Sequence, residues 1–109
     1  MEKDNHVLIC EFLGFKFYES HRKLFDYENN WNDLMNVVYK IESIYDDFHG
    51  YFGVHINSNS CTIQGTRLRT DPENPHYAYY NQFVEQYKIT ATYKAVVEFI
   101  KWYNENLKK

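Results

Sequence analysis

Glycine and proline are scarce in this chain, with four and two copies respectively. Four glycines leave no room for the Gly-rich loops that cradle phosphates, and the chain contains no Walker loop and no dinucleotide fingerprint. The nucleophile-elbow pattern G-x-S-x-G and the zinc-protease pattern H-E-x-x-H are also missing. We therefore expect a protein that is not an enzyme, and keep an uncharacterised enzyme as the last alternative.

Metal-binding patterns are missing as well. Cys10 and Cys61 form no C-x-x-C pair and have no histidine at ligand spacing, so we expect two reduced, buried thiols, with a single disulfide as the alternative. The five histidines are scattered. Asp46, Asp47 and His49 could hold a metal, but a solvated helix end is the favoured interpretation. We expect no metal and no cofactor.

Long hydrophobic runs are absent. Nothing approaches the roughly 18 apolar residues of a membrane span, and the apolar run in MEKDNHVLIC is too short for a signal peptide. A net charge of -3 and a pI near 5.9 give no help to non-specific binding of nucleic acid or membranes. We expect a soluble, cytoplasmic protein with no membrane partner and no extended nucleic-acid binding.

Aromatic residues, in contrast, are abundant: Tyr, Phe and Trp make up 19% of the chain. Tyr and Trp provide rigid, amphipathic contact area at protein interfaces and base-stacking sites. An AT-rich gene is the alternative explanation. A small core cannot bury every ring, so some rings must be exposed in either case.

Two segments have a helical period. Residues 30–49 begin with Asn30 as N-cap and end at Gly50. Their predicted inward face is Trp31, Leu34, Val38, Ile41, Tyr45 and Phe48. Residues 88–106 form the second helix. Its predicted inward stripe is Ile89, Tyr93, Val96, Val97 and Ile100, and its outward charges are Lys94, Glu98, Lys101 and Glu105.

Strand patterns fill much of the remaining sequence. Residues 51–65 alternate around the polar turn 57–60 and predict a β-hairpin, with Gly65 as a candidate bulge. Residues 15–27 fit an irregular hairpin. Residues 77–87 fit a helix or a strand, and the Pro-containing residues 70–76 before them form a loop.

The N-terminal residues 4–13 fit a short helix capped by Asp4 or Asn5, with Val7, Leu8 and Phe12 on one face, or alternatively a strand. The chain as a whole predicts one α+β domain over residues 1–109. In it, an antiparallel sheet of short hairpins is sandwiched with the two main helices.

Three segments, NNWNDLMNVVYKIESI, VHINSNSCTIQGT and ATYKAVVEFIKWYNEN, together resemble the phage ABA sandwich domain, a family of small phage and prophage proteins of Bacteroidota. The resemblance covers roughly residues 29–66 and 88–106, and 67–87 departs from it. Where the family usually has a second Trp in its opening motif, this chain has Asp33. The matching positions are Trp31, Leu34 and Met35, then Ala95 to Ile100 and Trp102 to Asn104. The resemblance implies a helix–sheet–helix sandwich and transfers no activity.

A candidate ligand site follows the second hairpin strand. If that strand continues, Arg67 and Arg69 point to one face, near a run of tyrosines and the polar face that carries His55. Arginine pairs beside aromatic rings suit a phosphate and a base, as in a small nucleotide or single-stranded nucleic acid. The alternative is a solvated sheet edge. The candidate ligand-binding residues are Arg67, Arg69, His55, Tyr77, Tyr79 and Tyr80.

A partner surface is the other candidate site. Phe99 and Trp102 lie off the centre of the last helix stripe, so they either wrap the sheet edge or meet a partner, including a second copy of the chain. The resemblance places the protein in a phage setting, where small proteins often inhibit host defences by binding. We therefore expect a non-catalytic phage or prophage protein that blocks a host defence protein or sequesters a small nucleotide signal, with a homo-oligomeric interaction module as the alternative.

Overall fold

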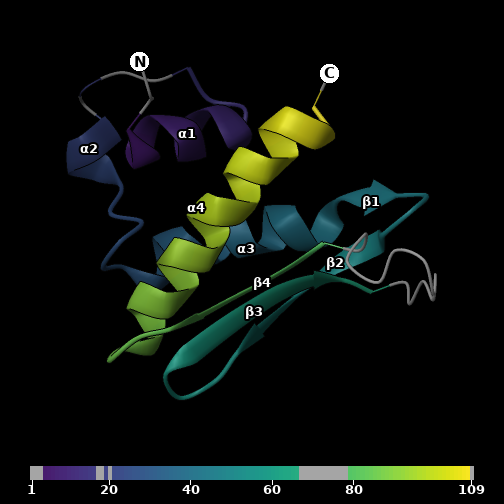
Figure 1. The fold of residues 1–109 in the computed structure, drawn as a ribbon. Coiled ribbons are helices and arrows are strands. Elements are labelled where there is room, and N and C mark those ends of the chain that lie inside the picture. The colour runs from purple at the N-terminus through teal and green to yellow at the C-terminus, as the bar shows by residue number, and fades with distance from the viewer. Residues whose placement is uncertain (1–3, 17–18, 20, 67–78, 109) are drawn as a thin grey trace.

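The computed structural model describes residues 4–16, 19, 21–66 and 79–108. Its α+β fold, as predicted, is shown in Figure 1. The elements follow in the order α1 (Asn5–Phe12), α2 (His21–Leu24), α3 (Trp31–Ser43), β1 (Tyr45–Asp46), β2 (Gly50–Ile56), β3 (Ser60–Gly65), β4 (Tyr80–Val84) and α4 (Lys88–Asn106).

The strands form one antiparallel sheet in the order β1-β2-β3-β4. The predicted β2–β3 hairpin is confirmed, with Ile56 opposite Cys61. The N–H of Asn57 donates to the carbonyl of Ser60 at 2.8 Å and closes the turn. Gly65 pairs with Phe52 in a continuous ladder, so the candidate bulge at this position is not formed. Of the two structures open for residues 77–87, the described part contains a strand, β4.

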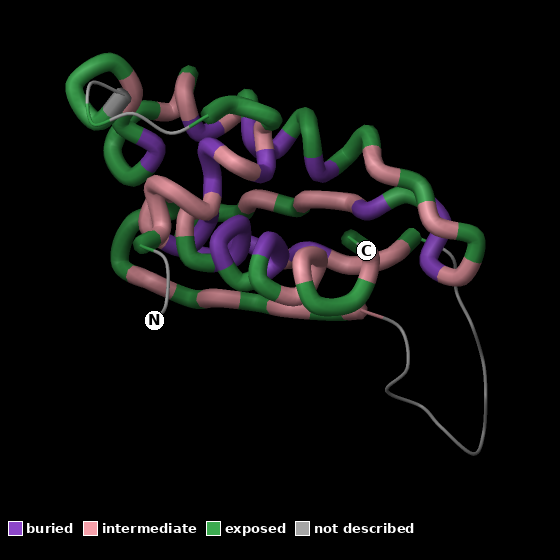
Figure 2. The backbone as a smooth tube through the Cα atoms, turned by 90° about the horizontal axis from the view of Figure 1, so that it is seen from above, coloured by how far each residue is buried: buried purple, intermediate pink, exposed green. Residues whose placement is uncertain are grey.

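Helices α3 and α4 pack on one face of this sheet. α4 lies over β3 and β4, and α3 lies beside it over β2 (Figure 1). In Figure 2 the buried segments gather where α4 crosses the sheet. Among the described elements this gives two layers, rather than the helix–sheet–helix order that the resemblance implies, because the outward-facing positions of the strands are polar or aromatic and stay accessible.

Helix α4 matches the predicted range, but its buried face is wider than the predicted stripe. Val96, Val97 and Ile100 are buried, whereas Ile89 and Tyr93 are only half-buried. The remaining buried positions are Ala91, Thr92, Ala95 and Phe99. The small alanines allow the helix axis to come close to the sheet, so flanking side chains are covered too.

Helix α3 begins as predicted and ends earlier. The Asn30 side chain accepts a hydrogen bond from the N–H of Asp33 at 3.1 Å, which caps the first turn. The helix was expected to reach residue 49, but Ile44 is extended and Tyr45 pairs with Tyr51 in the sheet. Gly50, with φ 73°, therefore opens β2 instead of ending the helix. The turn between Asp46 and His49 is closed by the Asp46 side chain, and it forms in place of the last helical turns.

The N-terminal segment is a short helix, as favoured. Asp4 caps α1 by accepting a hydrogen bond from the N–H of Val7 at 3.0 Å. The buried residues of α1 are Ile9, Cys10 and Phe12, rather than Val7, Leu8 and Phe12.

The expected hairpin over residues 15–27 is wrong for the described part of that segment, where α2 is a short helix. The predicted return strand has no partner strand within the described range. Leu24 is 69% exposed, and Tyr27 reaches the core next to α1. The polar residues that were expected to form a turn between two strands include His21, where α2 begins.

Candidate interaction surface

The face of the sheet that points away from the helices is open to solvent in the described structure. Strand residues alternate between two faces, and the inward ones carry the core. We call the accessible members of the opposite set the outer face: Tyr45, Tyr51, Gly53, His55, Thr62, Gln64, Tyr80, Gln82 and Val84.

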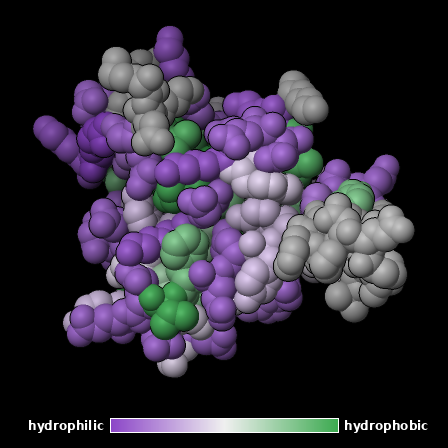
Figure 3. All heavy atoms as spheres, viewed as in Figure 1, coloured by the Kyte–Doolittle hydropathy of each residue, from purple (hydrophilic) through white to green (hydrophobic). Residues whose placement is uncertain are grey.

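The outer face contains no Lys, Arg, Asp or Glu, although charged residues make up 25% of the chain. Its large side chains are exposed: Tyr51 by 54%, Tyr80 by 58% and Val84 by 60%. The depletion of charge and the enrichment of Tyr are the composition of interface centres. The side of the molecule seen in Figure 3 is largely hydrophilic, with hydrophobic residues in separate patches.

Side chains of this face contact one another both across strands and along a strand. Tyr45 and Tyr51 pair in register, and their ring centroids are 5.1 Å apart in an edge-to-face arrangement. The Tyr80 hydroxyl donates to Oε1 of Gln82 at 3.3 Å. A Cβ on Gly53 would lie 3.1 Å from Nε2 of His55, so the glycine leaves room for that imidazole.

The predicted ligand residues do not converge within the described structure. Arg67, Arg69 and Tyr77 lie outside the described residues. His55 and Tyr80 share the outer face, but β3 separates their strands.

Tyr79 points to the opposite face of the sheet. Its ring packs 4.3 Å from that of Trp102, and its hydroxyl accepts a hydrogen bond from Nδ2 of Asn81 at 2.5 Å. Burial raises the pKa of Tyr79 to about 12. Tyr79 is therefore half-buried against the core, on the face of the sheet opposite to His55 and Tyr80.

The predicted partner residues form part of an aromatic cluster beneath α4. Phe99 is 0% exposed, so it offers no surface to a partner, and this correction follows from the wide buried face of α4. Trp102 is half-buried, 5.8 Å from the ring of Phe52 and 5.3 Å from that of His49. Contacts among these rings stabilise the packing of α4 against the sheet.

Asp46 and His49 form a structural turn between β1 and β2, not a solvated helix end. Oδ2 of Asp46 lies 2.6 Å from Nδ1 of His49 and also accepts the His49 backbone N–H at 3.0 Å. Burial opposes ionisation of Asp46, but these hydrogen bonds outweigh it and lower its pKa. Within the described ranges no group of three or more His, Cys, Asp and Glu side chains is arranged to hold a metal ion.

The cysteines are free and buried, as expected. Burial raises the pKa of Cys61 to about 11, so its thiol stays protonated at neutral pH. This is the behaviour of an inert core residue.

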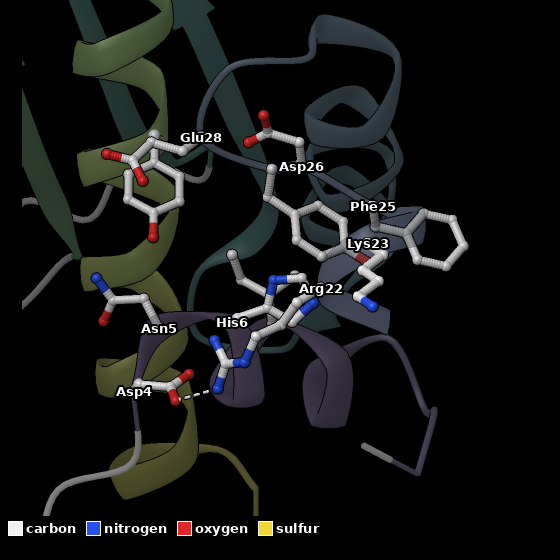
Figure 4. A pocket seen from close by; sticks show the side chains of 11 residues that line it. Asp4, Asn5, His6, Arg22, Lys23, Phe25, Asp26 and Glu28 are labelled. Atoms are coloured by element: carbon white, nitrogen blue, oxygen red, sulfur yellow. Dashed lines mark hydrogen bonds and ion pairs between the residues drawn. The ribbon is translucent and has the colours of Figure 1, made fainter. Parts of the chain in front are cut away.

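A separate cavity of about 530 Å³ opens between α1, α4 and the segment that joins α2 to α3 (Figure 4). On one side Arg22 pairs with Asp4 at 2.5 Å. On the other, burial and the charges of Glu28, Asp4 and Asp26 raise the pKa of Tyr93. The cavity is thus lined by both positive and negative side chains, some of which pair with each other. We therefore propose no class of ligand for it.

Sequence reasoning identified His55 and Tyr80 but missed Tyr45, Tyr51 and Gln82. The alternation in β2 already placed Tyr51 opposite the apolar positions, so its exposure could have been read from the sequence. Tyr45 was assigned to a helix, and Gln82 lay in a segment whose structure was left open.

No family model, curated protein or solved structure matches the chain. None of the described helices combines the length and apolar character needed to cross a membrane.

Proposed function

We propose that this chain is a non-catalytic binding protein whose outer face docks a second protein. The observation that carries the proposal is the composition of that face, which combines exposed Tyr51 and Tyr80 with no formal charge on its described residues. Binding of a protein over such a face releases water from aromatic surface and desolvates no charge. The other face of the sheet is packed against α3 and α4, which favours a surface that is pre-organised for docking.

A nucleotide or single-stranded nucleic acid has less support as the ligand of this face. Aromatic rings on a sheet can stack bases, but Lys and Arg supply most of the affinity for the phosphate backbone, and the outer face has neither. The arginines proposed for that role, Arg67 and Arg69, lie outside the described residues. We therefore favour a protein partner over a sequestered small nucleotide.

The biological role that we propose rests on the resemblance to the phage ABA sandwich domain. In that setting the partner is a host defence protein in the bacterial cytoplasm, and binding inhibits it. This role requires only that the partner surface be blocked, which a small, rigid sheet face can do without chemistry.

The test uses two matched double variants that each add two negative charges. His55→Glu with Gln64→Glu places them on the outer face, and Asn32→Glu with Asn36→Glu places them on exposed positions of α3. Tagged wild type and both variants are incubated with lysate of the bacterial host, and captured proteins are quantified by mass spectrometry. Any candidate is then purified and its affinity measured by calorimetry.

The proposal predicts that the outer-face variant loses about tenfold or more in affinity for the partner, whereas the α3 variant keeps it. Capture by wild type alone does not support the proposal. A partner that binds the outer-face variant as tightly as wild type would contradict it. For the biological role, expression of wild type but not of the outer-face variant should restore plaque formation by a phage that the host otherwise restricts.

A further inference from the structure

Strand β4 is an edge of the sheet with unused backbone hydrogen-bonding groups. The Gly65 N–H donates to the carbonyl of Tyr79, and the Glu85 N–H donates to the carbonyl of Asn59. The odd-numbered residues of this strand therefore face β3, since antiparallel strands alternate in the direction of their N–H and C=O groups. The N–H and C=O groups of Tyr80, Gln82 and Val84 consequently point away from the sheet. Within the described chain no backbone partner meets them.

The two edges of the sheet differ in their protection. At one edge, β1 is two residues long and carries Asp46, which is bound to His49. At the other, β4 is five residues long and contains no charge, proline or glycine. Proteins guard edge strands with short length, charge or proline, because an open edge pairs readily with another strand. The β4 edge has none of these protections.

We propose that β4 pairs with β4 of a second copy of this chain, antiparallel and about a two-fold axis that passes between the two Gln82 residues. In this register Gln82 faces its own copy, and Tyr80 faces Val84 of the other copy. The outward N–H and C=O groups at all three positions then find partners. A second copy is always present at the concentration of the chain itself, and an isologous edge pairing closes after two copies.

The side chains of β4 are self-complementary in this register. On the outer face the exposed Tyr80 ring lies against the exposed Val84 side chain, an aromatic and β-branched cross-strand pair, once on each side of the axis. Between them the two Gln82 amides can donate to and accept from each other.

The dimer would place two outer faces side by side on the same side of one continuous sheet. It rests on the hydrogen-bond directions of β4 and not on the proposed partner binding, so the two proposals can fail separately. The outer-face variant above leaves β4 unchanged, and the Gln82 variants below leave His55 and Gln64 unchanged.

The experiment measures the mass of the full chain in solution by light scattering and analytical ultracentrifugation. Wild type is expected to be a dimer. Gln82→Glu and Gln82→Lys each place two like charges opposite one another on the axis, and each should raise the dimer dissociation constant about tenfold or more. Mixing the two variants should restore dimerisation as a heterodimer, because opposite charges then meet. Gln64→Glu, the same change one strand inward on the same face, should remain dimeric.

A monomeric wild type at micromolar concentration would overturn the proposal. So would a dimer that survives both Gln82 variants, or variants that dissociate but do not form a heterodimer when mixed. Circular dichroism and thermal melting establish that each variant is folded. Gln82→Pro adds an independent check: its lost N–H points outward, so it should block dimerisation while preserving the β3–β4 ladder.

Discussion

Replacing Phe99 with Ala should strongly destabilise the fold, because this side chain is core and not a contact for a partner. Its ring is 0% exposed and lies 5.0 Å from that of Phe52 and 5.4 Å from that of Tyr79. A buried aromatic side chain removes at least about 150 Å² from water, and at roughly 25 cal/mol per Å² this is worth about 4 kcal/mol. Phe-to-Ala substitutions in cores cost about 3–5 kcal/mol, which agrees.

A loss of about 4 kcal/mol is a large part of the 5–15 kcal/mol that stabilises a domain of this kind. The measurement is urea unfolding followed by circular dichroism and Trp fluorescence. With a slope of about 2 kcal/mol per molar urea, the midpoint should fall by roughly 2 M. A double-mutant cycle with Phe52→Ala should add a coupling of about 0.5–1.5 kcal/mol for the ring pair.

The matched control is Tyr39→Ala on α3, where the ring is 67% exposed. Its effect on the free energy of unfolding should stay within about 0.5 kcal/mol. If Phe99→Ala costs less than about 1 kcal/mol, the ring is not packed as described. Its assignment to the core, and the placement of α4 on the sheet, would then be refuted.

Other perturbations test separate parts of the structure. Gly65→Ala should lower the free energy of unfolding by about 1–3 kcal/mol in urea titration, because the new methyl would lie 3.0 Å from Cβ and 3.1 Å from the carbonyl oxygen of His49; no loss would refute this close approach. Cys61 should resist a thiol reagent at mildly alkaline pH until the chain unfolds, since burial keeps its pKa near 11, and rapid labelling of the native protein would contradict its burial. The folded pKa of Tyr79, about 12, lies above its ordinary value of about 10, so its stabilising effect is complete below pH 10 and is lost as pH rises toward 12. Tyr79→Phe, which also removes the hydrogen bond from Asn81, should therefore reduce the alkaline loss of stability measured by urea unfolding, and an unchanged pH profile would count against this explanation.

The sequence predicted well what is decided locally. Asn30 before Trp31 marked the start of α3, because a cap needs only its own first turn. The alternation around residues 57–60 identified the β2–β3 hairpin for the same reason: its two strands are adjacent in the chain. The range of α4 followed from a long and regular apolar period.

The errors fall where a competing local turn or the packing of the helix on the sheet overrides the helical period. Tyr45 has helical spacing from Ile41, but pairing with Tyr51 and the turn at Asp46 place it in a strand. Phe99 looked peripheral on a helical wheel and is buried because α4 lies close to the sheet.

The outer face could be predicted only in part. It is assembled from separate strands, and β4 joins it from across residues 67–78. Its charge-free character was not visible in any one segment of the sequence. The free edge of β4 likewise depends on strand order, which local patterns do not specify.

The most direct test of the proposed function compares the affinity of one purified partner for the outer-face and α3 double-Glu variants. If the outer face is the docking surface, His55→Glu with Gln64→Glu should weaken binding about tenfold or more, and Asn32→Glu with Asn36→Glu should leave the dissociation constant unchanged. Equal affinities for the two variants, or a loss confined to the α3 variant, would contradict it.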